Sequence, residues 1–194
     1  MKYLGSEWTS FVSESSGATG SLKEYYGFIW KSGEIRIAHS LGYFKDPNNL
    51  FATKPYGAEF ITSNSDFTLI LVHLSQNVVS ETRHLTDVYD YFLGLVAAGN
   101  LILGGDFDHA SSDQLDTFRE VESLADAASF KTKTIVGPHG PVSSGDHIFV
   151  NLFTKGSLRG AGAYDYVTEL AAGDYAKSRE TISDHLPIYI DLGL

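Results

Sequence analysis

Two short acidic segments lie next to apolar runs, and this placement constrains the fold more than any other feature of the chain. The run Leu101–Leu103 leads into the sequence GGDFD at 104–108, and the sequence SDHLP at 183–187 leads into a second apolar run. An apolar run of this length predicts a buried strand. Carboxylates at the end of such a strand lie at the edge of a sheet, where a hard cation can bind them through oxygen. The two segments therefore indicate metal-assisted hydrolysis of a phosphate ester.

The rest of the pattern predicts many strands and a few helices. Apolar and aromatic segments separated by turn residues predict strands at 11–12, 26–30, 35–38, 58–61, 67–72, 148–152 and 186–190. One helix is predicted to stop at Gly99-Asn100, from apolar residues at helical spacing: Leu85, Val88, Phe92 and Leu95. Ser111 and Gln114 predict a capping box for a second helix, with these apolar positions: Leu115, Phe118, Val121 and Leu124. This mixture predicts packed sheets with helices outside them.

Composition excludes several classes of protein. The chain has 194 residues, enough for one domain with a substantial core, and no cysteine, which excludes disulfides and thiolate chemistry. A formal net charge of −10 disfavours binding nucleic acid through a broad basic surface. No apolar run approaches the roughly 18 residues of a membrane span, and the first residues lack the apolar segment of a secretory signal. We therefore expect no membrane span and, by default, a cytoplasmic location.

Six short motifs occur in the same order as in one known family. They are KEYY at 23–26, KP at 54–55, VHLS at 72–75, GDFD at 105–108, GDHI at 145–148 and SDHLP at 183–187. On these motifs the chain resembles the endonuclease/exonuclease/phosphatase superfamily, and within it the proteins like deoxyribonuclease I. The resemblance extends from about Trp8 to Leu192. It implies an α+β fold of two packed mixed β-sheets flanked by helices, a four-layer αββα sandwich, as a single domain over residues 1–194.

Two histidines carry most of the chemistry that the resemblance implies. His73 and His185 would flank the scissile phosphate, with Glu24 beside the first and Asp146 beside the second. A carboxylate fixes the tautomer of an imidazole and stabilises its protonated form. One histidine could then take the proton of the attacking water while the other stabilises the leaving oxygen.

The acidic segments supply the candidate metal ligands. Asp106 and Asp108 share one face of an extended segment because side chains alternate with a period of two. By resemblance Asp106 binds the metal or activates water, and Asp184 completes the site. The ion would be Mg²⁺, Mn²⁺ or Ca²⁺, since all the ligands are oxygen atoms. His109 could also reach a bound metal.

The chain departs from the family in two ways. The family begins with a strand that carries a catalytic Asn and a second strand that ends in a metal-binding Glu, and neither has a counterpart here. We therefore expect an N-terminally incomplete domain, with the absent strands supplied by a longer reading frame or by a second subunit in a homo-oligomer. The family also has Asn where Asp108 stands. An ionised Asp cannot donate a hydrogen bond to phosphate, so its charge is hypothesised to replace part of the missing Glu.

Function follows from these residues as a set of alternatives. The leading hypothesis is a divalent-metal-dependent phosphodiesterase, a DNA endonuclease of low sequence specificity. Lys54 would contact a substrate phosphate, although a solvated surface lysine is equally compatible with the sequence. The alternatives are a phosphatase of small phosphate esters or lipid headgroups, and a catalytically impaired binding module.

Overall fold

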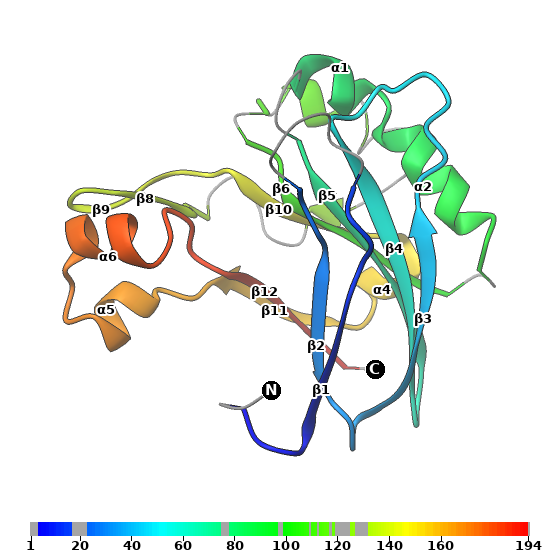
Figure 1. Ribbon diagram of the computed structural model, residues 1–194, viewed down its shortest axis with the longest axis horizontal. Helices are drawn as coiled ribbons and strands as arrows, with labels where there is room; N and C mark the ends of the chain where they lie inside the picture. Colours follow the sequence, from blue (N-terminus) through cyan, green and yellow to red (C-terminus); the bar gives the residue numbers. More distant parts are fainter. Residues whose placement is uncertain are drawn as a thin grey trace.

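The described residues form one central sheet with smaller strand pairs and helices around it (Figure 1). The computed structural model describes residues 4–16, 23–74, 78–96, 99–108, 110–111, 113–116, 118, 125–126 and 132–193, with the backbone alone for residues 36–38, 78 and 125–126. Among these residues no helix has the length and the apolar sequence needed to cross a bilayer.

The central sheet has six strands in the order β3-β4-β5-β6-β10-β7. Their bounds are Ile35–Tyr43 for β3, Thr53–Thr62 for β4, Asp66–His73 for β5, Asn100–Asp106 for β6, Asp146–Val150 for β10 and Ala125–Asp126 for β7. Strands β5 and β6 run parallel, and the other neighbouring pairs are antiparallel. The last residues of β5 and β6 therefore lie beside the first residues of β4 and β10, at one end of these four strands.

Helices cover one face of this sheet. They are α1 (Val78–Arg83) and α2 (Leu85–Leu93), and α2 turns Val88 and Phe92 toward the strands. Ile70 and Val72 of β5 belong to the same buried cluster as these helical side chains. Burying a large apolar side chain contributes about 1.5–3 kcal/mol, so this cluster holds the sheet and the helices together.

A two-stranded ribbon covers the opposite face. It consists of β1 (Trp8–Val12) and β2 (Gly27–Lys31), and its Phe28 packs with Tyr56 and Phe60 of β4. Leu69 and Leu71 of β5 pack against this aromatic cluster. Because successive side chains of a strand point to opposite faces, β5 contributes to both layers of the core.

The C-terminal third of the chain adds two further ribbons and three short helices. The ribbons are β8 (Ile135–Gly137) with β9 (Gly140–Ser143), and β11 (Leu158–Ala163) with β12 (Ile188–Leu192). The helices are α4 (Leu152–Lys155), α5 (Tyr166–Leu170) and α6 (Tyr175–Thr181). A small core ties these parts together, and it contains Val136, Tyr166, Val167 and Leu186. Figure 1 shows α5 and α6 grouped beside β8 and β9, away from the helices α1 and α2.

The predicted α+β architecture is confirmed, with two differences of detail. In the described residues the second layer is not one sheet, because β1–β2 and β11–β12 are separate ribbons. The predicted helix stop at Gly99-Asn100 is wrong, since α2 ends at Leu93 and Asn100 already begins β6.

The capping box is confirmed, because Gln114 Oε1 accepts from Ser111 N–H and Ser111 Oγ accepts from Gln114 N–H. Val121 and Leu124 lie outside the described residues. The single domain over 1–194 and its absent N-terminal strands stay predictions.

Gly105 permits the close approach of β5 and β6 at the end of the two strands, next to Asp106. Its φ angle is +146°, and an added Cβ atom would lie 2.0 Å from the carbonyl oxygen of Val72. No rotamer change relieves this overlap, because the backbone fixes the position of a Cβ atom and the Val72 oxygen is itself a backbone atom. A side chain at this position would push apart the two strands that carry His73 and Asp106.

We predict that Gly105→Ala lowers the free energy of unfolding by about 3 kcal/mol or more, from backbone strain and strand displacement. The matched control is Gly27→Ala in β2, where an added Cβ atom meets nothing within 4 Å. That control should change the free energy of unfolding by less than about 1 kcal/mol. Urea denaturation of both variants measures the difference, and equal stability of the two variants contradicts the prediction.

Candidate active site

Four neighbouring strands place one polar residue each in a single row across the sheet. Thr53 pairs with His73 between β4 and β5, and His73 pairs with Asp106 between β5 and β6. Asp106 also pairs with Asp146 between β6 and β10. Paired residues on adjacent strands have side chains about 5 Å apart on the same face. The backbone pairing alone therefore brings these four side chains together at one end of the four strands.

The first His–carboxylate pair joins this row to the segment before β2. Glu24 forms a β-bridge with Ser16, and its Oε2 lies 3.2 Å from His73 Nδ1. The same Oε2 accepts a hydrogen bond from the Thr53 hydroxyl group. Thr53 is only 4% exposed, so its buried hydroxyl group helps to hold the partly exposed Glu24 carboxylate in place.

The second pair joins the row to the segment before β12. His185 Nδ1 lies 2.9 Å from Asp146 Oδ2 and 3.2 Å from Asp146 Oδ1. His185 is also held through its backbone, because it forms a β-bridge with Ile135 and because Leu186 N–H donates to the Thr134 carbonyl. The Thr134 hydroxyl group accepts from Asp146 N–H at 3.2 Å, which ties the backbone of Asp146 to the same segment.

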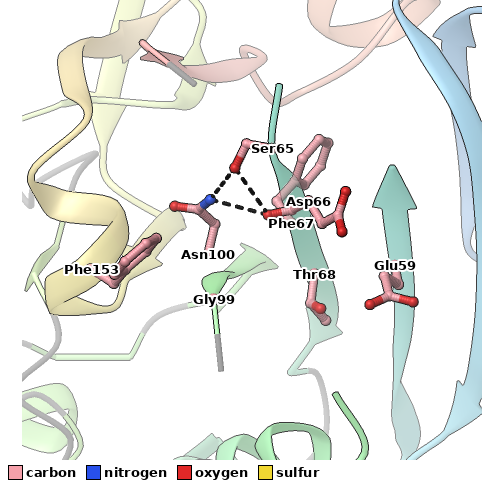
Figure 2. A pocket seen from close by; sticks show the side chains of 8 residues that line it. All are labelled: Glu59, Ser65, Asp66, Phe67, Thr68, Gly99, Asn100 and Phe153. Atoms are coloured by element: carbon pink, nitrogen blue, oxygen red, sulfur yellow. Dashed lines mark hydrogen bonds between the residues drawn. The ribbon is translucent and has the colours of Figure 1, made fainter. Parts of the chain in front are cut away.

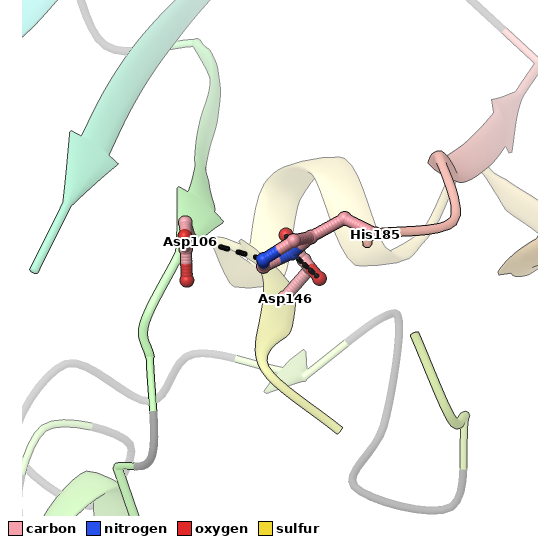
Figure 3. Close-up of side chains that lie close together, drawn as sticks. All are labelled: Asp106, Asp146 and His185. Atoms are coloured by element: carbon pink, nitrogen blue, oxygen red, sulfur yellow. Dashed lines mark hydrogen bonds and ion pairs between the residues drawn. The ribbon is translucent and has the colours of Figure 1, made fainter. Parts of the chain in front are cut away.

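Asp106 lies between the two histidines. Its Oδ2 is 3.8 Å from His73 Nε2 and 3.8 Å from His185 Nε2. Its Oδ1 accepts a hydrogen bond of 2.7 Å from Asp108 N–H. Figure 3 shows His185 reaching from its own segment to the space between Asp106 and Asp146. Each imidazole therefore has a carboxylate on Nδ1 and turns Nε2 toward one shared oxygen.

The surroundings favour a protonated His185. The hydrogen bond that His185 Nδ1 donates to the Asp146 carboxylate raises the pKa of His185 from 6.5 to about 9, against the opposing effect of burial. Burial raises the pKa of the Asp106 carboxyl group, while the Asp108 N–H and the His185 charge lower it. His185 is thus an imidazolium at neutral pH, and its charge stabilises the partly buried carboxylate of Asp106.

The donor set of this cluster suits a hard divalent cation. Among the described residues, Asp106, Asp146 and His185 offer ligand atoms that lie within 4.8 Å of one another. A protonated imidazole has no lone pair for a metal, so the available donors are then carboxylate oxygens. Asp184 adds a 59% exposed carboxylate whose Oδ1 lies 4.0 Å from His185 Nε2. Asp106 belongs both to this cluster and to the ligand set predicted from the sequence.

Six of the predicted site residues lie together in the structure: Glu24, His73, Asp106, Asp146, Asp184 and His185. The prediction that Asp108 shares one face of an extended segment with Asp106 is wrong. Strand β6 ends at Asp106, and Asp108 has a left-handed backbone with φ of +51°. The alternation of side chains therefore does not extend to Asp108, whose backbone N–H donates to Asp106 Oδ1. His109 lies outside the described residues.

From the start of β4, Thr53 reaches the site, whereas no hydrogen bond or ion pair within the described chain joins Lys54 to it. The sequence analysis did not predict Thr53, because the KP motif at 54–55 favoured the charged Lys54 as the phosphate contact. The signal that could have found it is strand alternation, which points Thr53 and Lys54 to opposite faces.

A His–carboxylate pair is not sufficient to mark a site. His84 Nδ1 lies 3.0 Å from Asp87 Oδ2, but the two residues are only three apart, at the N-cap and in the first turn of α2, and Asp87 is exposed. The pairs of His73 and His185 differ because their members are distant in the sequence and converge on Asp106. Convergence on one carboxylate is the feature that distinguishes the candidate site.

Comparisons with known proteins identify the fold. No protein-family model matches the chain, and no curated protein matches its sequence. Solved structures do match. An endonuclease/exonuclease/phosphatase family protein from Leptotrichia buccalis has a TM-score of 0.66 and 15% identity, over 100% of this chain and 74% of that one. The 3'-5' exonuclease NExo from Neisseria meningitidis has a TM-score of 0.62 and 16% identity, over 97% and 80%. TDP2 from D. rerio, complexed with a single-strand DNA product, has a TM-score of 0.63 and 14% identity, over 95% and 76%.

These matches confirm the resemblance at the level of the fold. Sequence identity of 14–16% is too low to transfer an activity, and function has to be argued from the site.

We predict that His185 titrates near pH 9 in chelator-treated protein and that Asp146→Asn moves its pKa toward 6.5, because the Asp146 hydrogen bond is the largest cause of the shift. A raised pKa in the folded state means that the imidazolium stabilises the fold fully below pH 6.5, and that this contribution is lost as the pH rises through about 9. NMR titration of the imidazole Hε1 resonance measures both values. Asp184→Asn is the control and should shift the pKa much less. A parent value near 6.5 contradicts the prediction.

Proposed function

Because the chain has the fold of endonuclease/exonuclease/phosphatase proteins and gathers two His–carboxylate pairs, we propose that it is a divalent-metal-dependent phosphodiesterase. Within that class we assign it to DNA endonucleases of low sequence specificity. The observation that carries the proposal is the approach of both histidine Nε2 atoms to one oxygen of Asp106. Two fold relatives support a nucleic-acid substrate, since one is an exonuclease and the other holds a single-strand DNA product.

The two histidines would divide the proton transfers. His185 holds a proton because Asp146 stabilises the imidazolium, so it is placed to protonate or stabilise the leaving oxygen. His73 is oriented through Nδ1 by Glu24 and would accept the proton of the attacking water at Nε2. A positioned acid or base typically contributes about 10²–10⁴ in rate. The Thr53 hydroxyl group supports this step by fixing the carboxylate that orients His73.

The carboxylates would hold the divalent cation, which we assign as Mg²⁺, Mn²⁺ or Ca²⁺. Asp106 is the central ligand, with Asp184 and Asp108 beside it. When bound, the cation polarises a phosphoryl oxygen and offsets the negative charge that gathers around the phosphate. The protein needs this positive charge, because a group of carboxylates alone repels a phosphate.

Two alternatives to this proposal are tested with it. The net charge of −10 disfavours extended contact with a polyanion, which favours a phosphatase of small phosphate esters or lipid headgroups. The second alternative is a catalytically impaired binding module, which would hold a ligand at the two His–carboxylate pairs without hydrolysing it. Separate edges on ribbons β1–β2 and β11–β12 are compatible with added strands from another segment or subunit, and such assembly stays a prediction.

Plasmid nicking with Mg²⁺ or Mn²⁺ tests the proposal. We expect nicking by the parent, loss of activity with chelator, and a rate at least about 100-fold lower for His185→Ala. The matched control is His84→Ala, which removes an exposed His–carboxylate pair on a helix and should keep the parent rate.

The other results separate the alternatives. Hydrolysis of small phosphomonoesters without nicking supports the phosphatase, and absence of both activities supports the binding module. Calorimetry of Mn²⁺ binding addresses Asp108 in the same protein set. If Asp108→Asn binds Mn²⁺ as tightly as the parent, the Asp108 carboxylate is not a ligand of the metal.

A further inference from the structure

Three consecutive backbone N–H groups just before β4 donate to two carboxylates. The N–H of Leu50 donates to Asp46 Oδ1 at 2.9 Å, and the N–H of Phe51 donates to Asp46 Oδ2 at 3.0 Å. The N–H of Ala52 donates to Glu81 Oε1 of α1 at 2.9 Å. Hydrogen bonds from a backbone N–H to a carboxylate are charge-assisted and stronger than neutral ones. The segment before β4 is therefore held at every one of these N–H groups.

The two carboxylates are also unusual in their burial. Within the residues that the structure describes, Asp46 and Glu81 are the acidic side chains that the fold buries, at 6% and 1% exposure. Burying a carboxylate costs free energy unless hydrogen bonds compensate it. Both bind one short segment, which connects the apolar core at Phe51 to the candidate active site at Thr53. Glu81 binds the residue that directly precedes Thr53.

A series of contacts leads from Glu81 to the imidazole of His73. Glu81 holds the N–H of Ala52, and the next residue, Thr53, donates its hydroxyl group to Glu24 Oε2. Glu24 Oε2 in turn lies 3.2 Å from His73 Nδ1. A shift of the segment before β4 would move the Thr53 hydroxyl group and release the carboxylate that it holds.

The position of Glu24 decides which nitrogen of His73 carries the proton. Glu24 Oε2 is 3.2 Å from Nδ1, whereas Asp106 Oδ2 is 3.8 Å from Nε2. A neutral imidazole carries one N–H, and the nearer acceptor favours the tautomer with that proton on Nδ1. In the proposed function this tautomer leaves Nε2 free to accept the proton of the attacking water. If Glu24 moved away, Asp106 would favour the Nε2–H tautomer, which cannot accept that proton.

We infer that Glu81 is a positioning residue for His73. It fixes the backbone at Ala52, and through Thr53 and Glu24 it keeps the proton of His73 on Nδ1. Glu81 acts through the place of its oxygen and not through its charge, because the Ala52 N–H needs an acceptor at hydrogen-bonding distance. The effect on activity rests on the proposed function, whereas the effect on the tautomer does not.

Two conservative variants of Glu81 separate position from charge. Glu81→Asp keeps the charge and shortens the side chain by one methylene group, so it should move the His73 population toward Nε2–H. Glu81→Gln keeps an amide oxygen at the same reach and removes the charge, so it should change the tautomer less than Glu81→Asp does. Thr53→Val removes the next contact in the series and should act as Glu81→Asp does. Long-range ¹H–¹⁵N NMR of the imidazole in chelator-treated protein measures the tautomer.

Two controls make comparable changes away from this series. Glu59→Asp makes the same shortening toward the other end of β4, in a separate pocket where Figure 2 shows the Glu59 side chain. At about 3.3 Å per residue, Glu59 lies about 20 Å from Thr53. Phe60→Leu removes aromatic contacts with Phe28 and lowers the free energy of unfolding in another part of the core. Both controls should keep the parent tautomer.

Plasmid nicking then measures the consequence for activity. Glu81→Asp and Thr53→Val should each lower the parent rate by about tenfold, because a misplaced base transfers protons less well. The double variant should lower the rate no further, since both changes interrupt the same series. If the parent does not nick DNA, the proposed function fails and the tautomer alone decides this inference.

Several results would overturn the inference. One is a parent protein in which His73 carries its proton on Nε2, or in which the Ala52 N–H exchanges with solvent as freely as an exposed amide. Another is a parent-like tautomer in folded Glu81→Asp or in Thr53→Val. A shift in Glu81→Gln or in either control as large as in Glu81→Asp also overturns it. Rate losses that multiply in the double variant would show that Glu81 does not act through Thr53.

Discussion

The pairing of four neighbouring strands is the constraint on which the candidate site depends. Thr53, His73, Asp106 and Asp146 pair in one row, so their positions are set by the backbone of the sheet. A slip of one residue in any of these pairs would turn a side chain to the opposite face. Gly105 keeps β5 and β6 close at this point, because a side chain there would overlap the Val72 carbonyl. The geometry of the candidate site is thus a consequence of sheet register, and the described segments outside the strands contribute Glu24, Asp184 and His185.

The carboxylates of the candidate site differ in their role because they contact different atoms of the two histidines. Asp106 faces both histidines through one oxygen, while Glu24 and Asp146 hold the histidines from the other side. The Asp146 hydrogen bond raises the pKa of His185 to about 9, so this histidine carries positive charge near a group of carboxylates. In the function that we propose, a substrate phosphate would need more positive charge than one imidazolium supplies. This shortage is our physical reason for proposing a divalent cation beside Asp106.

Much of the candidate site could be predicted from the sequence, because its motifs lie at strand ends and the apolar runs beside them mark those strands. Glu24, His73, Asp146 and His185 lie beside the partners that the resemblance implied. Contacts between distant segments could not be predicted in this way. The Thr53 hydroxyl bond to Glu24 joins residues 29 apart, and local periodicity carries no information about such a bond. The left-handed backbone at Asp108 ends the alternation that the prediction relied on, and a non-glycine residue rarely adopts that conformation.

Paramagnetic broadening by Mn²⁺ tests most directly whether a divalent cation binds at Asp106, beside the two histidines. Small additions of Mn²⁺ should broaden the imidazole resonances of His73 and His185 together, before that of the exposed His39. Asp106→Asn should remove the selective broadening while the protein stays folded, because it removes the shared ligand. Uniform broadening of all histidines, or selective broadening that survives in Asp106→Asn, would contradict a metal site centred on Asp106.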